Sequence, residues 1–347
     1  MEIVENPWRG RGLPEDVLSG APWPSVNADA PEALLARCPV AGETPLVEVT
    51  GFGASVWIKD ERGRMGLGSF KALGAAYVIA HEAAAQGAGE AGRDMSRALE
   101  GRTYITASAG NHGLSVAAGA HVFGARAVIY LSDTVPDSFA QKLKEKGAEV
   151  VRAGRDYEAS MAAAARTADE KGWTLLSDSS WPGYFDLPYR LMEGYLALAA
   201  EATRQMPEPP THILLQAGVG GLAGACAAYF REFWGDAPRI VVVEPEAAPA
   251  LIGSIRAGRP VESQGPVSNM GRLDCKAPSL IALKGLARDA DAFATILDAD
   301  ALAVLPALAA QGLASTESGA AGLAALRLMD LPGDARVLCI LSEEPDT

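Results

Sequence analysis

Short apolar runs alternate with longer amphipathic stretches over most of this 347-residue chain. A short apolar run bounded by glycine, proline or polar residues predicts a strand, whereas apolar positions three and four residues apart predict a helix. The predicted strands are 45–49, 56–60, 104–106, 127–131, 149–151, 213–217, 239–244 and 337–341. The predicted helices include 114–123, 136–146, 189–204 and one that ends near 234, and further elements lie at 279–288 and 294–297.

Strands and helices that alternate in this way predict parallel strands joined by right-handed crossovers, and therefore an α/β fold. The chain is longer than one hydrophobic core usually supports, so we expect two lobes. Residues 94–181 are expected to form a small domain, and 1–93 and 182–347 the two parts of a large domain. The first 45 residues, rich in proline and tryptophan, are expected to be an irregular arm with a short helix at 31–38.

Composition narrows the function classes. The formal net charge of -13 argues against nucleic acid, which needs a basic surface. No apolar run approaches the roughly 20 residues of a membrane span. The four cysteines are scattered without metal-ligand spacing, so no metal is expected, and the amino terminus lacks the order of a signal peptide. We therefore expect a cytoplasmic protein with reduced thiols.

The segment Gly66–Tyr77 is a glycine-punctuated turn that leads into an apolar helix with one lysine, Lys71, at its start. Ser69 is a candidate N-cap of that helix. A lone lysine on an apolar face usually extends its amine to solvent. Burial would instead disfavour the ammonium form and produce the nucleophilic amine that Schiff-base chemistry with a carbonyl needs.

A second candidate is the turn Gly218–Leu222, between a predicted strand and a predicted helix. Backbone amides and the helix dipole at such a turn can hold a phosphate. The turn also fits G-x-G-x-x-A, and Glu244 ends the next strand where a ribose-binding acid would be, so a dinucleotide-binding oxidoreductase is an alternative. A glycine turn required only for close packing is the simplest explanation of this motif alone.

The third candidate, Ser108–Gly113, also follows a strand and precedes a helix. An oxidoreductase has no evident use for this segment or for Lys71. An enzyme that holds a carboxylate, a phosphate and a Schiff base would use all three segments. His112 alone is more often a structural histidine, and we assign it no acid–base role.

Four segments, in their order along the chain, resemble the landmarks of the fold type II pyridoxal-phosphate (PLP) enzymes, the family of threonine dehydratase, serine racemase and the tryptophan synthase β chain. They are Ser69–Lys71, Ser108–Gly113, Gly218–Leu222 and Leu341–Glu343. The resemblance covers nearly the whole chain. It implies a two-lobed α/β fold of the tryptophan synthase β type, with parallel-rich sheets flanked by helices.

Within this family the sequence is most similar to the diaminopropionate ammonia-lyases. The similar segments are Ser69–Tyr77, Asp178–Trp181 with Gly183 and Tyr184, Gln216–Gly220, the loop Met270–Pro278 and Glu317–Gly322. The resemblance implies β-elimination from a small amino acid, giving a 2-oxo acid and ammonia, with 2,3-diaminopropionate as the first candidate substrate. It also implies a homodimer.

The resemblance further implies a role for individual residues. Lys71 would form the Schiff base with PLP and later remove the α-proton, and Asp178 would be a second base or bind the substrate ammonium group. Ser342 would meet the pyridine nitrogen, where a neutral hydroxyl suits direct elimination. The other implied contacts are Phe70 against the ring, Asn111 at the ring hydroxyl, the amides of Gly218, Val219, Gly220, Gly221 and Leu222 around the phosphate, and Ser108, Ala109, Gly110 and Asn111 at the substrate carboxylate.

The chain departs from the diaminopropionate ammonia-lyases at several positions. Ala109 stands where that family has an aspartate linked to use of the D-substrate, whereas serine/threonine dehydratases commonly have Ser or Ala there. The loop 270–278 carries Arg272, Asp274 and Lys276, and its two cations could receive an anionic group of a substrate or simply be solvated. The chain is also shorter than the family. A serine/threonine or 3-hydroxyaspartate dehydratase is therefore the main alternative, and a nicotinamide oxidoreductase or a non-catalytic protein are remote ones.

Overall fold

The computed structural model describes residues 1–87 and 95–345 of the chain. The chain divides into two compact units. The larger unit contains Met1–Glu32, Val40–Phe70 and Ser179–Thr347, and the smaller unit contains Ala33–Pro39 and Lys71–Asp178. The boundary expected between 93 and 94 lies outside the described residues, and the domain limits drawn from the sequence stay a prediction.

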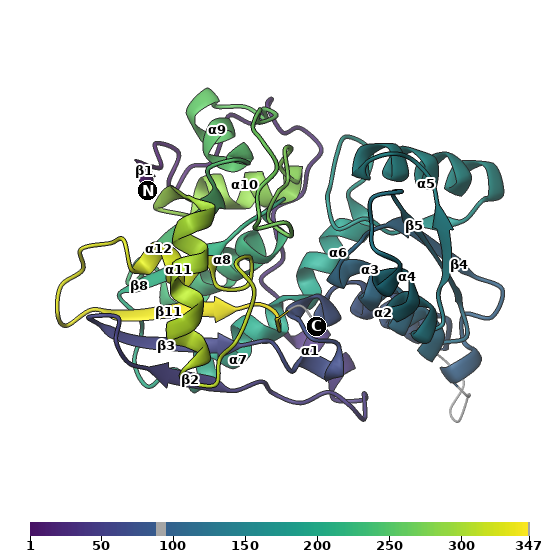
Figure 1. Cartoon of the computed structure of the whole chain (residues 1–347), viewed down its shortest axis with the longest axis horizontal. Helices are drawn as coiled ribbons and strands as arrows, with labels where there is room; N and C mark the ends of the chain where they lie inside the picture. The colour runs from purple at the N-terminus through teal and green to yellow at the C-terminus, as the bar shows by residue number, and fades with distance from the viewer. Residues whose placement is uncertain (88–94, 346–347) are drawn as a thin grey trace. The chain divides into compact units, whose positions relative to one another are not determined.

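A mixed sheet of seven strands forms the centre of the larger unit (Figure 1). Its order is β1 (Glu2–Glu5), β10 (Ala292–Ile296), β9 (Arg239–Pro245), β8 (His212–Gln216), β11 (Arg336–Leu341), β3 (Ser55–Asp60) and β2 (Leu46–Val49). The strands from β10 to β3 are parallel to their neighbours, and only β1 and β2 run antiparallel at the edges. Helices on both faces of parallel strands bury them completely, which explains their continuous Val, Ile and Leu runs. The expected parallel-rich α/β fold is confirmed.

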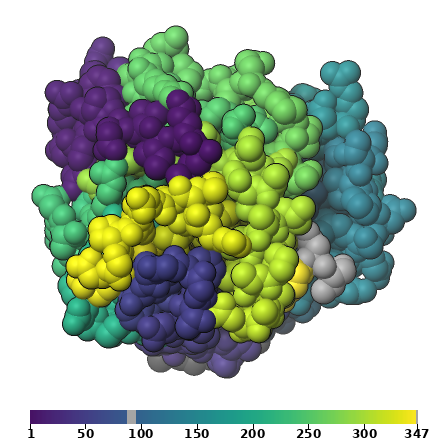
Figure 2. All heavy atoms as spheres, turned by 60° about the vertical axis from the view of Figure 1, so that its left-hand side comes forward, coloured from purple at the N-terminus to yellow at the C-terminus, as the bar shows by residue number. Residues whose placement is uncertain are grey.

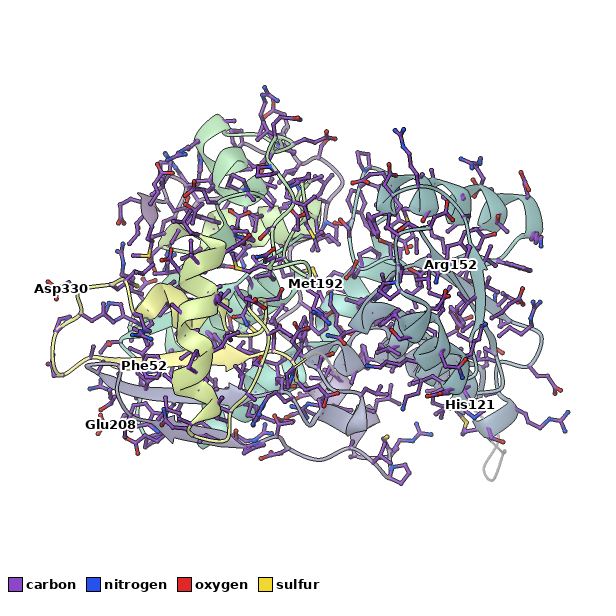
Figure 3. All side chains as sticks on the ribbon, in the orientation of Figure 1. Phe52, His121, Arg152, Met192, Glu208 and Asp330 are labelled. Carbon is purple, nitrogen blue, oxygen red and sulfur yellow. The ribbon has the colours of Figure 1, made fainter. Side chains whose placement is uncertain are left out.

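Helices cover the sheet and pack closely on one another. They are α6 (Asp186–Gly194), α7 (Leu196–Gln205), α8 (Gly221–Trp234), α9 (Ala250–Ala257), α10 (Leu280–Asp289), α11 (Asp298–Ala309) and α12 (Ala321–Leu326). A Cβ atom at Gly224 of α8 would lie 3.1 Å from the Cα of Ala282 in α10 and from the Cε of Met192, which Figure 3 labels. Glycine at this position therefore lets α8 approach α10.

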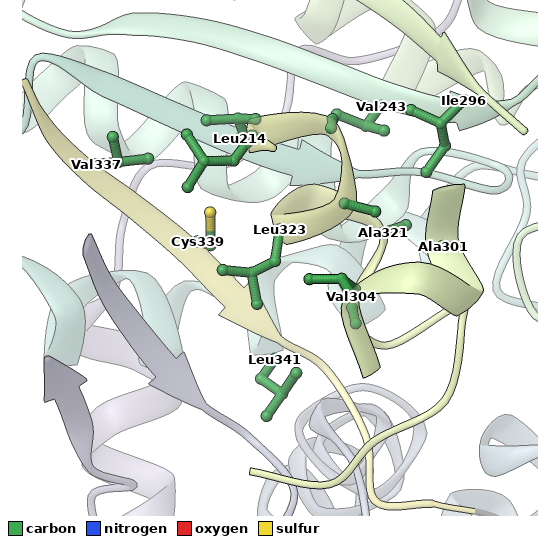
Figure 4. Packing of buried hydrophobic residues seen from close by; sticks show 14 of the residues in the cluster. Leu214, Val243, Ile296, Ala301, Val304, Ala321, Leu323, Val337, Cys339 and Leu341 are labelled. Carbon is green, nitrogen blue, oxygen red and sulfur yellow. The ribbon is translucent and has the colours of Figure 1, made fainter. Parts of the chain in front are cut away.

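An apolar cluster lies between the sheet and the helices α11 and α12 (Figure 4). Leu214, Val337 and Cys339 contribute from the strands, Val304 from α11 and Leu323 from α12. Each of these side chains is fully buried. The cluster fixes the strands that lead to the candidate site.

The smaller unit has a sheet of four parallel strands. Their order is β6 (Glu149–Arg152), β5 (Arg126–Leu131), β4 (Thr103–Ala107) and β7 (Thr174–Leu175). The helices of this unit are α2 (Ala75–Gly87), α3 (Asn111–Val122), α4 (Asp137–Glu145) and α5 (Tyr157–Lys171), and the short helix α1 (Asp29–Leu35) crosses the limit between the units. At Gly119 of α3 a Cβ atom would lie 2.9 Å from the Cα of Ala76, so α2 and α3 are in backbone contact.

The structure corrects three local predictions. The arm expected to be irregular contributes strand β1, in which Ile3 pairs with Ala294 of β10, and Figure 2 shows this purple segment on the surface. The helix expected over 189–204 is two helices that break at Tyr195, directly after Gly194. Lys71 lies in a single 3₁₀ turn, Phe70–Leu73, before α2 begins. None of the described helices has the length and the apolar surface needed to cross a membrane.

The apolar cluster predicts a large effect of truncation at Leu323. Leu323→Ala should lower the free energy of unfolding by about 2–5 kcal/mol, because the fully buried side chain leaves a cavity. Leu302→Ala, at a side chain that is 56% exposed, is the matched control and should change it by no more than about 0.5 kcal/mol. Urea unfolding followed by circular dichroism measures both, and equal losses would contradict the assignment of the cluster.

Candidate functional site

Three neighbouring strands of the larger sheet end at the same edge and lead into candidate residues. β8, β11 and β3 are parallel neighbours, so their carboxyl ends coincide. The glycine turn 218–222 follows β8, Ser342 follows β11, and the segment to Phe70 follows β3. This edge is where open α/β sheets bind their ligands.

The glycine turn connects β8 to α8 through a left-handed residue. Gly220 has φ +96°, which disfavours any residue with a side chain. A Cβ atom at Gly218 would lie 2.9 Å from the Sγ of Cys275, so the loop 270–278 packs directly on the turn. The first intrahelical donor is the amide of Gly224, which bonds to the carbonyl of Gly220 at 2.8 Å. The amides of Gly221, Leu222 and Ala223 precede it and have no acceptor within the helix.

Two serines, Ser180 and Ser279, connect the glycine turn to the start of α10. The amide of Ser279 donates to the carbonyl of Val219 at 2.9 Å. The hydroxyls of Ser180 and Ser279 lie 2.7 Å apart, and the amide of Ile281 donates to Ser180 Oγ at 2.9 Å. The start of α10 is therefore fastened to the glycine turn. A turn with free amides at the start of a 14-residue helix fits a phosphate group.

Backbone hydrogen bonds join the residues before Lys71 to the end of the chain. The amide of Phe70 donates to the carbonyl of Ser342 at 3.1 Å, and the amide of Glu344 donates to that of Gly68 at 2.9 Å. The ring of Phe70 lies 5.0 Å from that of Tyr195 between centroids. Phe70 and Ser342, which the sequence placed in one site, are thus adjacent in the larger unit.

Ser69 does not cap a helix as expected. Its side chain is 1% exposed, and its hydroxyl has no hydrogen-bond partner among the described residues. The backbone of Ser69 instead pairs with that of Glu343 in an antiparallel bridge. A buried hydroxyl without a partner among the described residues calls for an explanation, and a cofactor bound beside Lys71 would provide one.

In the smaller unit Lys71 and Asp178 form an ion pair. Lys71 Nζ lies 2.6 Å from Asp178 Oδ2, and each side chain is 21% exposed. Burial alone would raise the pKa of Asp178, but the positive charge of Lys71, and that of His112 when protonated, hold this pKa well below its usual range. The carboxylate is therefore ionised at neutral pH. The structure brings together the two residues that the sequence named as catalytic.

His112 has the structural position that the sequence analysis gave it. Its Nε2 donates to the carbonyl of Leu176 at 2.8 Å, and its side chain is buried. Burial lowers the pKa of His112, and the charge of Lys71 lowers it further against the opposing effect of Asp178. The imidazole is therefore neutral at pH 7 and supports the segment that ends at Asp178.

The segment Ser108–Gly113 forms the start of α3. Ser108 Oγ accepts hydrogen bonds from the amides of Gly110 at 3.3 Å and Gly113 at 3.1 Å. A Cβ atom at Gly113 would lie 2.8 Å from the carbonyl oxygen of Ser108, so the turn requires glycine there. Ala109 is exposed, and Ser108, Gly110 and Asn111 are half-buried. This turn can present polar groups to a carboxylate while its own helix start is capped.

The two cations of the loop 270–278 are held by the chain. Arg272 Nε lies 3.0 Å from Glu343 Oε2, and the amide of Arg272 donates to Ser318 Oγ at 3.2 Å. Lys276 Nζ lies 2.5 Å from Asp274 Oδ1 and also donates to the carbonyls of Ala247 and Pro266, each at 2.8 Å. Lys276 thus stabilises the loop.

Glu244 does not lie in the position of a ribose-binding acid. Its two carboxyl oxygens accept the amides of Leu251 and Ile252, each at 2.8 Å, so it caps the start of α9 from inside the protein. The side chain is fully buried. Glu244, the acidic residue of the dinucleotide-binding pattern, therefore has a structural role. This removes the main support for the remote oxidoreductase alternative.

Sequence reasoning missed several residues that support the site. Ser279 contacts the glycine turn, Ser180 contacts Ser279, and Tyr195 contacts Phe70. Ser180 lies in a segment of the family resemblance, but no local pattern indicated a supporting role for any of the three. No group of three or more histidine, cysteine, aspartate or glutamate side chains among the described residues could hold a metal ion.

Comparison with known proteins identifies relatives of the chain. The family model described as pyridoxal-phosphate dependent enzyme matches residues 38–343. The diaminopropionate ammonia-lyase of Salmonella typhimurium is 33% identical over 289 residues, which cover 76% of this chain and 71% of that protein. The L-threonine ammonia-lyase of Geobacter sulfurreducens is 30% identical over 242 residues, 69% of this chain and 58% of that one.

The solved structures agree with the sequence relatives. The crystal structure of diaminopropionate ammonia-lyase from Escherichia coli in complex with an aminoacrylate-PLP azomethine reaction intermediate has a TM-score of 0.87 and 29% identity. The match covers 99% of this chain and 93% of that chain.

The buried position of Glu244 predicts a pH dependence. Burial raises the pKa of Glu244 from an ordinary 4.5 to about 8, against the opposing hydrogen bonds from the amides of Leu251, Ile252 and Ala250. A carboxyl with a raised pKa in the folded state stabilises the protein fully below pH 4.5 and loses this effect as the pH rises to about 8. The wild type should therefore lose stability relative to Glu244→Gln between about pH 5 and 8, by up to about 1.4 kcal/mol per pH unit.

Urea unfolding at several pH values measures this difference. Glu246→Gln, at an exposed glutamate two residues away, is the control and should follow the wild type at every pH. Parallel profiles for the wild type and Glu244→Gln would contradict the raised pKa.

Proposed function

The chain belongs to the family of pyridoxal-phosphate dependent enzymes, and from this premise we propose that it is an ammonia-lyase acting on L-2,3-diaminopropionate. Its cofactor is PLP, and its reaction is the β-elimination of a small amino acid to a 2-oxo acid and ammonia. The observation that carries the proposal is the Lys71–Asp178 pair, because it places an ionised carboxylate 2.6 Å from an amine that can bind a carbonyl.

We propose a role in cofactor binding for each of the following residues. In the larger unit the amides of Gly218, Val219, Gly220, Gly221 and Leu222 hold the phosphate, Phe70 lies against the ring and Ser342 meets the pyridine nitrogen. In the smaller unit Lys71 holds the cofactor covalently through Nζ and Asn111 hydrogen-bonds the ring hydroxyl. PLP, when bound to an amino acid, withdraws electrons from the α-carbon and makes the α-proton acidic.

The remaining chemistry belongs to the chain's own side chains. Ser108, Ala109, Gly110 and Asn111 bind the substrate carboxylate at the start of α3. Lys71 Nζ, once the substrate amine has displaced it from the cofactor and left it a free amine, accepts the α-proton. Asp178 acts either as a second base or as the group that binds the β-ammonium of the diamine. The pKa of Asp178 is low because of the charge of Lys71, so Asp178 becomes a stronger base whenever Lys71 Nζ is neutral.

The choice of enantiomer rests on Ala109. An aspartate at this position is linked to the D-substrate in the resembling family, and alanine has no proton-accepting group. Lys71 remains as the base on one face of the α-carbon, so we propose that the L-enantiomer is the substrate. The homodimer and the cytoplasmic location that the sequence suggested stay predictions.

A serine/threonine dehydratase is the second candidate, and Ala109 is the observation that favours it. The 3-hydroxyaspartate version is weaker, because Lys276 is engaged with Asp274 and two carbonyls, and Arg272 with Glu343. Lys276 Nζ would have to give up one of these contacts to bind a β-carboxylate, and the charge of Arg272 is already paired with that of Glu343.

The substrate is tested by measuring 2-oxo acid and ammonia from L- and D-2,3-diaminopropionate, L-serine, L-threonine and the 3-hydroxyaspartates, with added PLP. We expect the L-diamine to give two ammonia molecules per pyruvate, at a rate at least about tenfold above that of the D-form, because Ala109 provides no base for the second enantiomer. Turnover of hydroxy amino acids alone would replace the proposal with the dehydratase.

Asp178→Asn separates the two roles of this carboxylate. Loss of a base should lower kcat by about 100-fold on both L-2,3-diaminopropionate and L-serine, whereas loss of an ammonium-binding group should raise KM for the diamine only. Steady-state kinetics on both substrates distinguish the two. Asp169→Asn, at an exposed aspartate of α5, is the control, and an Asp178→Asn enzyme with unchanged constants would remove Asp178 from the site.

A further inference from the structure

A cluster of buried charges lies at the end of β3, outside the residues assigned above. Lys59, Glu61 and Arg64 belong to β3 and the turn that follows it, and Glu201 belongs to α7. Their side chains are 0%, 0%, 1% and 6% exposed, in this order. Two cations and two anions make the cluster neutral.

Arg64 lies at the centre of this cluster and binds both carboxylates. Its Nε and Nη2 donate to Glu61 at 2.8 and 2.7 Å, and its Nη1 and Nη2 donate to Glu201 at 2.8 and 2.6 Å. Thr44 Oγ1 donates to Glu61 Oε1 at 2.5 Å and accepts a bond from Arg64 at 3.0 Å. Lys59 Nζ completes the cluster, 2.6 Å from Glu201 Oε2.

A cluster of this kind contributes little net stability. The cost of removing four charges from water offsets most of their attraction, and apolar side chains of similar size often stabilise a core as well. The planar guanidinium, however, can donate hydrogen bonds to two carboxylates in only one arrangement. The cluster therefore selects a conformation more than it adds stability.

The cluster selects the backbone conformation of the turn from Glu61 to Phe70. Met65 has φ +51° and ψ 21°, and Gly66 and Gly68 also have positive φ, so the turn is left-handed at three positions. A left-handed methionine costs about 1–2 kcal/mol and persists only where its surroundings impose it. One end of the turn is held by the bond from the amide of Glu61 to the carbonyl of Leu341 at 2.9 Å, and the other by the pairing of Phe70 with Ser342.

Helix α7 and the residue directly before it contact the two ends of this turn. Glu201 of α7 binds Arg64 near its beginning, and Tyr195, the residue directly before α7, lies against Phe70 at its end. A displacement of the turn would therefore break two contacts, one with Glu201 of α7 and one with Tyr195 directly before it. Phe70 is bonded directly to Lys71.

We propose that Arg64, with Glu61 and Glu201, is a positioning residue for Lys71: the buried ion cluster holds the turn 61–70 in one conformation and so sets where the Lys71 backbone leaves the larger unit. This proposal rests on Lys71 holding the cofactor. The cluster touches neither substrate nor cofactor and acts through the turn.

The test compares two buried arginines of the larger unit. Arg64→Lys keeps the charge but loses the planar fork. Arg231→Lys is the matched control, because Arg231 is 8% exposed, pairs with Asp291 and donates to the carbonyls of Asp289 and Pro238. Thr44→Val, which removes only the hydroxyl bridge, is a milder second variant if Arg64→Lys does not fold.

Hydrogen–deuterium exchange of the peptide 61–71 is measured in the cofactor-free protein, and PLP affinity by titration. We expect Arg64→Lys to speed exchange in this peptide and to weaken PLP binding, each by at least about tenfold, because the two-carboxylate geometry is lost. Thr44→Val should show the same pattern more weakly. Arg231→Lys should lower the Tm and leave both readouts within about twofold of the wild type.

Slow exchange and unchanged PLP affinity in Arg64→Lys would overturn the proposal. Losses in Arg231→Lys that match those in Arg64→Lys would also overturn it, because the effect would then be general destabilisation. Faster exchange in the cofactor-free variant does not depend on which amino acid is the substrate. Failure of the positioning role of Arg64 can therefore be distinguished from failure of the proposed function.

Discussion

The common edge at which β8, β11 and β3 end is the constraint on which the larger unit's part of the site depends. Because these parallel neighbours are in register, their carboxyl ends lie side by side. The segments that follow them, which are the glycine turn, Ser342 and the segment to Phe70, therefore begin at the same edge of the sheet. The Phe70–Ser342 and Gly68–Glu344 hydrogen bonds then join the last two of these segments. Lys71 follows directly, so these hydrogen bonds constrain the position of its backbone on this side.

Charges around this edge are matched by partners that the chain supplies. Glu343 pairs with Arg272, Asp274 with Lys276, and Glu201 with Arg64 and Lys59. Glu244 has no cationic partner among the residues that the structure describes, and burial raises its pKa. The glycine turn itself offers backbone amides, whose partial positive charge suits a phosphate without a buried cation. An anionic protein can therefore bind an anionic cofactor.

The sequence predicted what depends on local pattern. Strand β8, the glycine turn and α8 follow from an apolar run, three glycines and helical spacing. The family resemblance named Lys71 and Asp178 separately, and their ion pair was not predicted. The other interactions that the sequence could not predict also join distant residues. Arg64 and Glu201 are 137 positions apart, and β1 becomes a strand only because β10 offers an edge. Glu244 caps α9 instead of facing a ribose, and the hydroxyl of Ser69 has no hydrogen-bond partner among the described residues instead of capping a helix.

Borohydride reduction of the PLP-loaded protein, followed by peptide mass spectrometry, tests the central claim most directly. We expect a pyridoxyl group on Lys71 alone, because this lysine follows the fixed Phe70–Ser342 pairing and lies beside Asp178. A label on another lysine, or no label on a protein that still turns over an amino acid, would contradict it.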